Sequence, residues 1–134
     1  MSSEQTRYRT LKDVPAEEYM APGTPLCAGC GAQLSLRLAL KALGPHTIVV
    51  NVPGCMALMA IYPFASLKLP FVFTSFVAAP ATAQGIVDAI DVLRSKGVHL
   101  PDDTKVLVVT GDGAAYDIGL QSTSGTLHRQ LDYY

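Results

Sequence analysis

The sequence has 134 residues, of which 49% are hydrophobic and 16% are charged. Ten basic and eleven acidic residues give a net charge of −1, which excludes the basic surface typical of proteins that bind nucleic acid or anionic membranes. A chain of this length predicts one domain with its own buried core.

Residues 1–24 are predicted to form an extended arm, because they are mostly polar and contain Pro15 and Pro22. They lack the apolar core and the cleavage site of a secretory signal, so we expect a cytoplasmic protein. Residues 25–134 should form the folded α/β domain.

Hydrophobic periodicity predicts, in order, a helix, two strands, a helix, a strand and a helix. Their ranges are 32–43, 47–52, 71–76, 81–96, 105–110 and 118–131. Apolar residues spaced three or four apart in the predicted helices should face the core. In the helix at 32–43 they are Leu34, Leu38 and Ala42, with Leu36, Leu40 and Leu43 beside them. They are Ile86, Ile90 and Leu93 in the helix at 81–96, and Leu120, Leu127 and Leu131 in the helix at 118–131. Strands with little charge are typical of parallel sheets covered on both faces. The predicted fold class is therefore α/β, with a mostly parallel sheet and flanking helices.

The stretch 47–67 carries no charge and raises the question of a membrane span. Pro53, Gly54 and Pro63 interrupt it, and a helix crossing lipid must satisfy its backbone hydrogen bonds internally. We therefore predict a segment buried in protein, with no membrane span.

Three cysteines are candidate metal ligands. Cys27 and Cys30 form a C-x-x-C pair around two small residues, a spacing that lets two thiolates hold one metal centre. Cys55 follows a predicted strand, at the end where α/β sheets bind ligands. The pair by itself is also compatible with buried small side chains, a redox-active dithiol or a zinc site.

Gly111, Asp112 and Gly113 come directly after a predicted buried strand and before a helix. The glycines permit a tight turn whose amides can approach a phosphate, and the carboxylate can bind a divalent cation. A plain turn with Asp112 as a helix cap would have the same letters. A dinucleotide fingerprint would need a glycine where Tyr116 stands, so the cation-binding interpretation is retained.

Three segments together resemble a known family. They are Leu26–Gln33 (LCAGCGAQ), Asn51–Met56 (NVPGCM) and Val109–Ser122 (VTGDGAAYDIGLQS). Their order and spacing resemble the thiamine-diphosphate-binding beta subunit of pyruvate:ferredoxin oxidoreductase and of related 2-oxoacid:ferredoxin oxidoreductases. The resemblance covers the chain from about Pro25 onward and leaves out the arm.

This resemblance implies a subunit of an enzyme that oxidatively decarboxylates a 2-oxoacid, by default pyruvate, to acyl-CoA. It implies thiamine diphosphate, Mg²⁺ and a 4Fe–4S cluster as cofactors, with electrons passed to ferredoxin. Cys27, Cys30 and Cys55 would be cluster ligands, and Asp112 a magnesium ligand. The residues implied to bind the thiamine cofactor are Ala32, Cys55, Gly111, Asp112, Gly113 and Ala114. The implied partners are an alpha subunit, further subunits of the complex, ferredoxin, the 2-oxoacid and coenzyme A.

In this family the fourth cluster cysteine and an asparagine that binds magnesium lie farther along the chain. We therefore expect this sequence to be a fragment of a longer subunit, truncated in its thiamine-diphosphate-binding domain and inactive alone. Ala32 and the pair Val77–Ala78 depart from common family patterns, which leaves phenylglyoxylate or another aromatic or branched 2-oxoacid as an alternative substrate. The alternative from another class is a non-catalytic zinc-binding module built on Cys27, Cys30 and Cys55.

Overall fold

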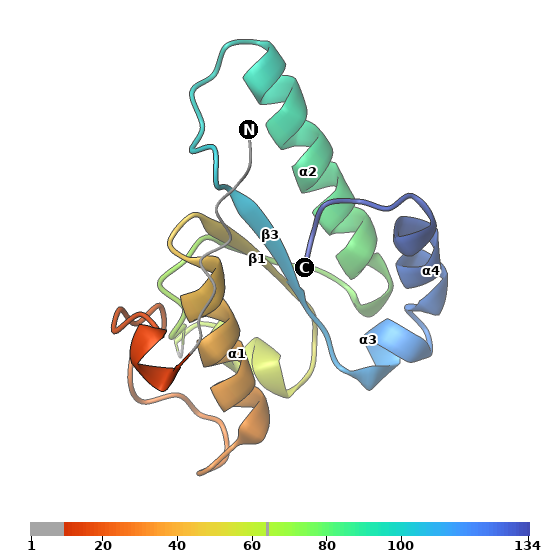
Figure 1. Ribbon diagram of the computed structural model, residues 1–134. Coiled ribbons are helices and arrows are strands. Elements are labelled where there is room, and N and C mark those ends of the chain that lie inside the picture. Colours follow the sequence, from red (N-terminus) through yellow and green to blue (C-terminus); the bar gives the residue numbers. More distant parts are fainter. Residues whose placement is uncertain (1–9, 64) are drawn as a thin grey trace.

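A three-stranded parallel sheet lies at the centre of the computed structural model, which describes residues 10–63 and 65–134 (Figure 1). The strands are β1 (Thr47–Asn51), β2 (Phe71–Phe73) and β3 (Lys105–Val109), and their order in the sheet is β2-β1-β3. Both pairings are parallel: Val49 of the central strand lies beside Phe71 on one side and Leu107 on the other. The predicted α/β class with a mostly parallel sheet is confirmed.

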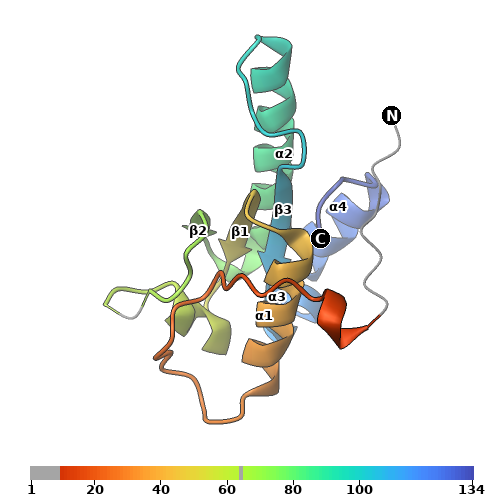
Figure 2. The ribbon, with the colours of Figure 1, turned by 60° about the vertical axis from the view of Figure 1, so that its left-hand side comes forward.

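Helices cover both faces of this sheet (Figures 1 and 2). Successive strand residues point to opposite faces, so Val49 belongs to the core under α1 (Gly31–Leu43) and Val50 to the core under α2 (Ala79–Ser95). Every residue of β1 except Ile48 is buried. The expectation that an uncharged strand would be covered on both sides is confirmed for β1.

The helix α1 confirms the element predicted at 32–43, but much of its predicted apolar face is exposed. Leu36 and Leu40 are buried, whereas Leu34 and Leu38 are 54% and 47% exposed. Leucines occur on more than one face of this helix, so their spacing indicates a helix without indicating which row the sheet will cover. The prediction that Leu34 and Leu38 face the core was wrong for this reason.

The helix α2 begins two residues before its predicted range, with Pro80 in its first turn, where a proline costs no hydrogen bond. Ile90 is buried as predicted, but Leu93 is 40% exposed, because this end of α2 extends past the sheet (Figure 1). Among the described residues, Phe76–Ser95 is long and apolar enough to cross a membrane by length and composition. One such helix is weak evidence for a span, since α2 packs Ala83 and Ile90 against the sheet.

The helix predicted at 118–131 corresponds to α4 (Leu120–His128), and a short helix that was not predicted, α3 (Asp112–Tyr116), precedes it. Gly119 separates them, and its N–H donates to the Gly113 carbonyl at 3.2 Å. The chain thus turns sharply after five helical residues, and this turn sets the direction of α4.

The apolar spacing of α4 did not predict its buried side. Leu120 and Leu127 are 51% and 68% exposed, whereas Thr126 is 2% exposed. The Thr126 hydroxyl and the Tyr133 hydroxyl share a hydrogen bond of 2.7 Å, which satisfies this polar side chain inside the fold. The inward side of α4 is therefore partly polar, and the predicted face of Leu120 and Leu127 was wrong.

The described part of the amino-terminal arm, residues 10–24, packs against its own domain. Tyr19 and Met20 are buried in the α1-side core, each 7% exposed. Met20 forms an antiparallel bridge with Leu67, and the Lys68 N–H donates to the Tyr19 carbonyl at 2.9 Å. Residues 1–9 lie outside the described residues, and the extended arm stays a prediction there.

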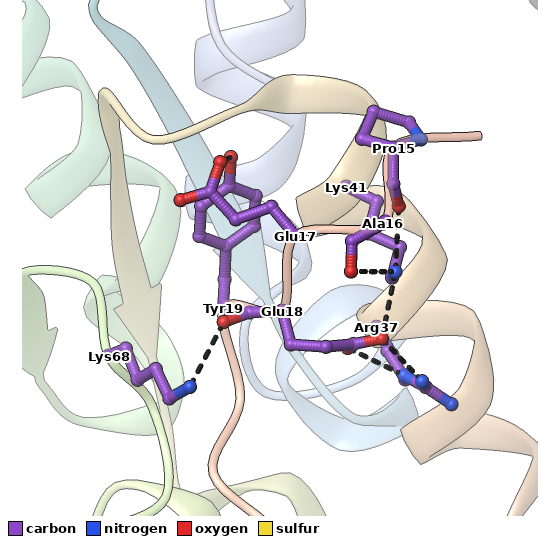
Figure 3. A network of polar contacts seen from close by, with 8 residues as sticks. All are labelled: Pro15, Ala16, Glu17, Glu18, Tyr19, Arg37, Lys41 and Lys68. Carbon is purple, nitrogen blue, oxygen red and sulfur yellow. Dashed lines mark hydrogen bonds and ion pairs between the residues drawn. The ribbon is translucent and has the colours of Figure 1, made fainter. Parts of the chain in front are cut away.

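Polar contacts hold the same arm on α1 (Figure 3). The Nε and Nη2 groups of Arg37 donate to the Glu18 carboxylate, and Lys41 pairs with that carboxylate at 2.8 Å. The Lys41 ammonium is buried and also donates to the Pro15 carbonyl at 2.8 Å and to the Ala16 carbonyl at 3.4 Å. These contacts explain how a lysine can lie on the covered side of α1.

Candidate functional site

A cavity of about 550 Å³ lies at the carboxyl ends of β1 and β3. This edge is where open α/β sheets bind ligands, because the loops that leave parallel strands diverge there. The cavity is lined by Ala32, Asn51, Val52, Pro53, Gly54, Cys55, Met56, Phe76, Val109, Thr110, Gly111, Asp112 and Gly113. Its volume lies in the range of small-molecule and cofactor sites, roughly 300–1,000 Å³.

One wall of the cavity is the turn from β3 into α3. Gly111 is extended, with φ −92° and ψ −179°, and Asp112 starts the helix directly after it. The Asp112 carboxylate is exposed and accepts the Gly113 N–H at 2.9 Å. Open space lies beside both glycines where a side chain would project. This turn therefore exposes backbone and a carboxylate to the cavity, and the predicted binding of a phosphate and a cation there stays a prediction.

Ala114 lies behind this wall. It is fully buried in the α2-side core and is not among the residues that line the cavity. Gly119 packs against its backbone so closely that a Cβ atom added at Gly119 would lie 1.8 Å from the Ala114 carbonyl oxygen. Ala114 therefore anchors the turn that carries Asp112, and its proposed contact with a cofactor stays a prediction.

The turn from β1 into the 3-10 helix η2 (Cys55–Met59) also lines the cavity. Gly54 has φ +147°, a conformation that residues with a side chain rarely adopt, and it brings Cys55 to the cavity. Ala32, from the first turn of α1, completes this side. Five of the six residues predicted to bind the thiamine cofactor thus meet at one cavity: Ala32, Cys55, Gly111, Asp112 and Gly113.

The three cysteines are free thiols, with Cys27 and Cys55 exposed and Cys30 half-buried. Cys27 and Cys30 form a turn, in which the Cys30 N–H donates to the Cys27 carbonyl at 3.1 Å. Only Cys55 of the three lines the cavity. Within residues 10–63 and 65–134, no three histidine, cysteine or acidic side chains are grouped closely enough to hold a metal ion. The structure therefore does not assemble the predicted three-thiolate set, and that set stays a prediction.

The lining residues that were not predicted to bind the cofactor include one aromatic and one buried polar side chain. Phe76, in η3 (Phe76–Ala78), lines the cavity and is 41% exposed. Asn51 also lines the cavity but is only 1% exposed. A polar residue closing an uncharged strand could have indicated Asn51, whereas no local pattern distinguishes Phe76 from a core aromatic residue.

Comparison with known proteins gives a consistent picture, although no protein-family profile matches the chain. The chain is 43% identical over 120 residues to pyruvate synthase subunit PorB of Methanocaldococcus jannaschii, a match that covers 88% of this chain and 40% of the relative. It is 39% identical to PorB of Pyrococcus furiosus, with 87% of this chain and 36% of the relative covered. It is 37% identical to ketoisovalerate oxidoreductase subunit VorB of the same organism, with 89% and 38% covered. The chain thus spans about two fifths of the length of these relatives.

Proposed function

Because this chain is related over most of its length to the beta subunits of 2-oxoacid:ferredoxin oxidoreductases, we propose that it forms part of their thiamine-diphosphate site. One observation carries the proposal. The Asp112 turn and the Cys55 turn, which are more than fifty residues apart in sequence, line a single cavity of about 550 Å³. A site of this size with a carboxylate and open glycine backbone suits a magnesium diphosphate.

Each wall has a distinct part in this proposal. The Asp112 carboxylate would bind Mg²⁺, and the backbone at Gly111 and Gly113 would lie along the diphosphate. Ala32 and Cys55, which line the same cavity, would approach the other end of the cofactor. Thiamine diphosphate, when bound, supplies the chemistry that decarboxylates a 2-oxoacid. The residues of this chain bind and orient it, and no acid or base among them is assigned to the reaction.

We further propose Cys27, Cys30 and Cys55 as ligands of a 4Fe–4S cluster, on the sequence resemblance. The geometry does not yet fit this assignment, because the described residues do not bring these thiols together. No step of the reaction is therefore derived through a cluster.

The proposed substrate is pyruvate, with transfer to coenzyme A and electrons to ferredoxin. Names of relatives support an oxidoreductase acting on 2-oxoacids, but a pyruvate synthase subunit and a ketoisovalerate oxidoreductase subunit are 39% and 37% identical to this chain. Identity at this level does not separate the two substrates. The chain would act within a complex of several subunits in the cytoplasm, a compartment in which thiols stay reduced.

Titration of thiamine diphosphate into the assembled complex, in the presence of Mg²⁺, tests the proposal. Asp112→Asn should weaken binding at least about tenfold, since it replaces a charged ligand of a divalent ion with a neutral one. Asp117→Asn is a matched control, because Asp117 is exposed, ends the same short helix and does not line the cavity. Equal affinities of the Asp112 variant and the wild type would contradict the proposed site.

Metal analysis of the same preparation, kept free of oxygen, tests the cluster. Iron and sulfide that disappear in Cys55→Ser would support the thiolate assignment. Stoichiometric zinc without iron would instead support the non-catalytic module.

A further inference from the structure

Asn51 is the last residue of the central strand, and its side chain is almost completely buried although it borders the cavity. A buried amide is tolerated when its donor and acceptor are both satisfied. Here the Asn51 Oδ1 accepts the Val52 N–H at 2.8 Å, and the Nδ2 donates to the Met56 carbonyl at 3.1 Å. The side chain therefore reaches across the turn and holds the residue just after Cys55.

The two ends of η2 are held by different partners. The Met59 carbonyl, at its far end, accepts the N–H groups of Ser66 at 2.7 Å and Leu67 at 3.3 Å. At the near end, the bond from Asn51 to Met56 joins the turn to the sheet. Within the turn, the Ala57 N–H donates to the Gly54 carbonyl at 3.0 Å, a local bond that does not fix the turn relative to β1.

Asn51 also fixes the neighbouring loop. Its backbone carbonyl accepts the Thr74 N–H at 2.9 Å, just before the segment that brings Phe76 to the cavity. One residue at the end of the central strand thus has contacts with two cavity-forming loops. Its burial and its two side-chain hydrogen bonds restrict the rotation of the amide.

We propose that Asn51 is a positioning residue, which sets where the Cys55 thiol lies at the cavity through the Met56 carbonyl. The functional importance of Cys55 in this inference rests on the proposed function. The effect of Asn51 on the position of Cys55 does not. Loss of the Asn51 side chain should release the near end of η2, while the far end stays attached to residues 66–67. The exposed thiol would then move relative to the cavity wall.

The test compares variants in the protein expressed in full with its natural partner subunits, stripped of metal. Asn51→Leu removes both side-chain bonds at similar volume, and Asn51→Asp keeps the acceptor for Val52 but loses the donor to Met56. Thr47→Val is the matched control, because Thr47 is fully buried in the same strand and donates to the Gly44 carbonyl at 2.9 Å, at the opposite end. Alkylation by N-ethylmaleimide is followed at each cysteine by peptide mass spectrometry.

The measured quantity is the alkylation rate of Cys55 divided by that of Cys27. We expect both Asn51 variants to change this ratio by about tenfold, the equilibrium effect of one lost hydrogen bond, and Thr47→Val to leave it unchanged. An unchanged ratio in the Asn51 variants, or an equal change in Thr47→Val, would overturn the inference. If Asn51→Leu does not fold, Asn51→Asp decides by the same criterion.

The same experiment separates this inference from the proposed function. The ratio is measured without metal or cofactor, so it responds to Asn51 whether or not the protein binds thiamine diphosphate. Wild-type protein that fails to bind thiamine diphosphate would remove the proposed function and leave the positioning role standing. If the wild type binds thiamine diphosphate and both Asn51 variants leave the ratio unchanged, the proposed function stands and the positioning role is overturned.

Discussion

Two glycines of the carboxyl-terminal segment should respond in opposite ways to the same substitution, Gly→Ala. At Gly119 an added Cβ would lie 1.8 Å from the carbonyl oxygen and 2.6 Å from the carbonyl carbon of Ala114, and both atoms belong to the backbone. At Gly125, in the interior of α4, no heavy atom lies within 4 Å of the added Cβ. One position has no room for a methyl group and the other has open space.

The expected magnitudes follow from these surroundings. Gly119 has φ −91°, an ordinary value for any residue, so its cost in Gly119→Ala is steric alone. Overpacking of this kind costs about 1–3 kcal/mol, at the upper end here because backbone atoms must move. Gly125→Ala should stabilise the protein by up to about 1 kcal/mol, since alanine is the better helix former. The two variants should therefore differ by roughly 2–4 kcal/mol in free energy of unfolding.

Urea unfolding followed by circular dichroism measures this difference, with the midpoint and the slope fitted together. The Gly119 variant should also bind thiamine diphosphate more weakly, because Ala114 anchors the turn that carries Asp112, while Gly125→Ala should bind as the wild type does. Equal stability of the Gly119→Ala variant and the wild type would refute the close packing between the two helices. A stable Gly119→Ala variant that binds thiamine diphosphate normally would also refute the link between this packing and the Asp112 turn.

Two further predictions concern the core and the arm. Leu40→Ala should lower the free energy of unfolding by about 2–5 kcal/mol, because the side chain is fully buried, whereas Leu38→Ala in the same helix, 47% exposed, should cost less than about 1 kcal/mol in thermal unfolding experiments. Hydrogen bonds from Arg37 and then Lys41 lower the pKa of the Glu18 carboxyl from 4.5 to about 2. A pKa that is lower in the folded state gives stability that is present above pH 4.5 and is lost as the pH falls toward 2. Glu18→Gln should therefore have a lower free energy of unfolding at neutral pH, and this free energy should depend less on pH in the acid range. Denaturation at a series of pH values measures both effects. A pH profile equal to that of the wild type would contradict the role of these contacts.

Much of the local structure could be predicted from the sequence, because it depends on neighbouring residues. An uncharged segment rich in β-branched residues indicated the buried strand β1. The apolar residues between Lys105 and Gly111 indicated β3. The glycines of the Asp112 turn and the proline and glycine before Cys55 marked where the chain leaves each strand. Parallel strands bring such ends to one edge of a sheet, so the two turns could be expected to meet.

Tertiary contacts decided the rest, because several arrangements satisfy the same local pattern. The leucines of α1 form more than one apolar row, and only packing on the sheet selected Leu36 and Leu40 over Leu34 and Leu38. Lys41 is buried because the distant arm supplies Glu18 and the Pro15 carbonyl, which helical periodicity cannot indicate. The role of Asn51 likewise depends on where the Met56 carbonyl lies in space. Residue type and spacing thus indicated most of the elements and the two turns. The faces that are buried and the contacts that fix Cys55 arise only when segments far apart in the chain come together.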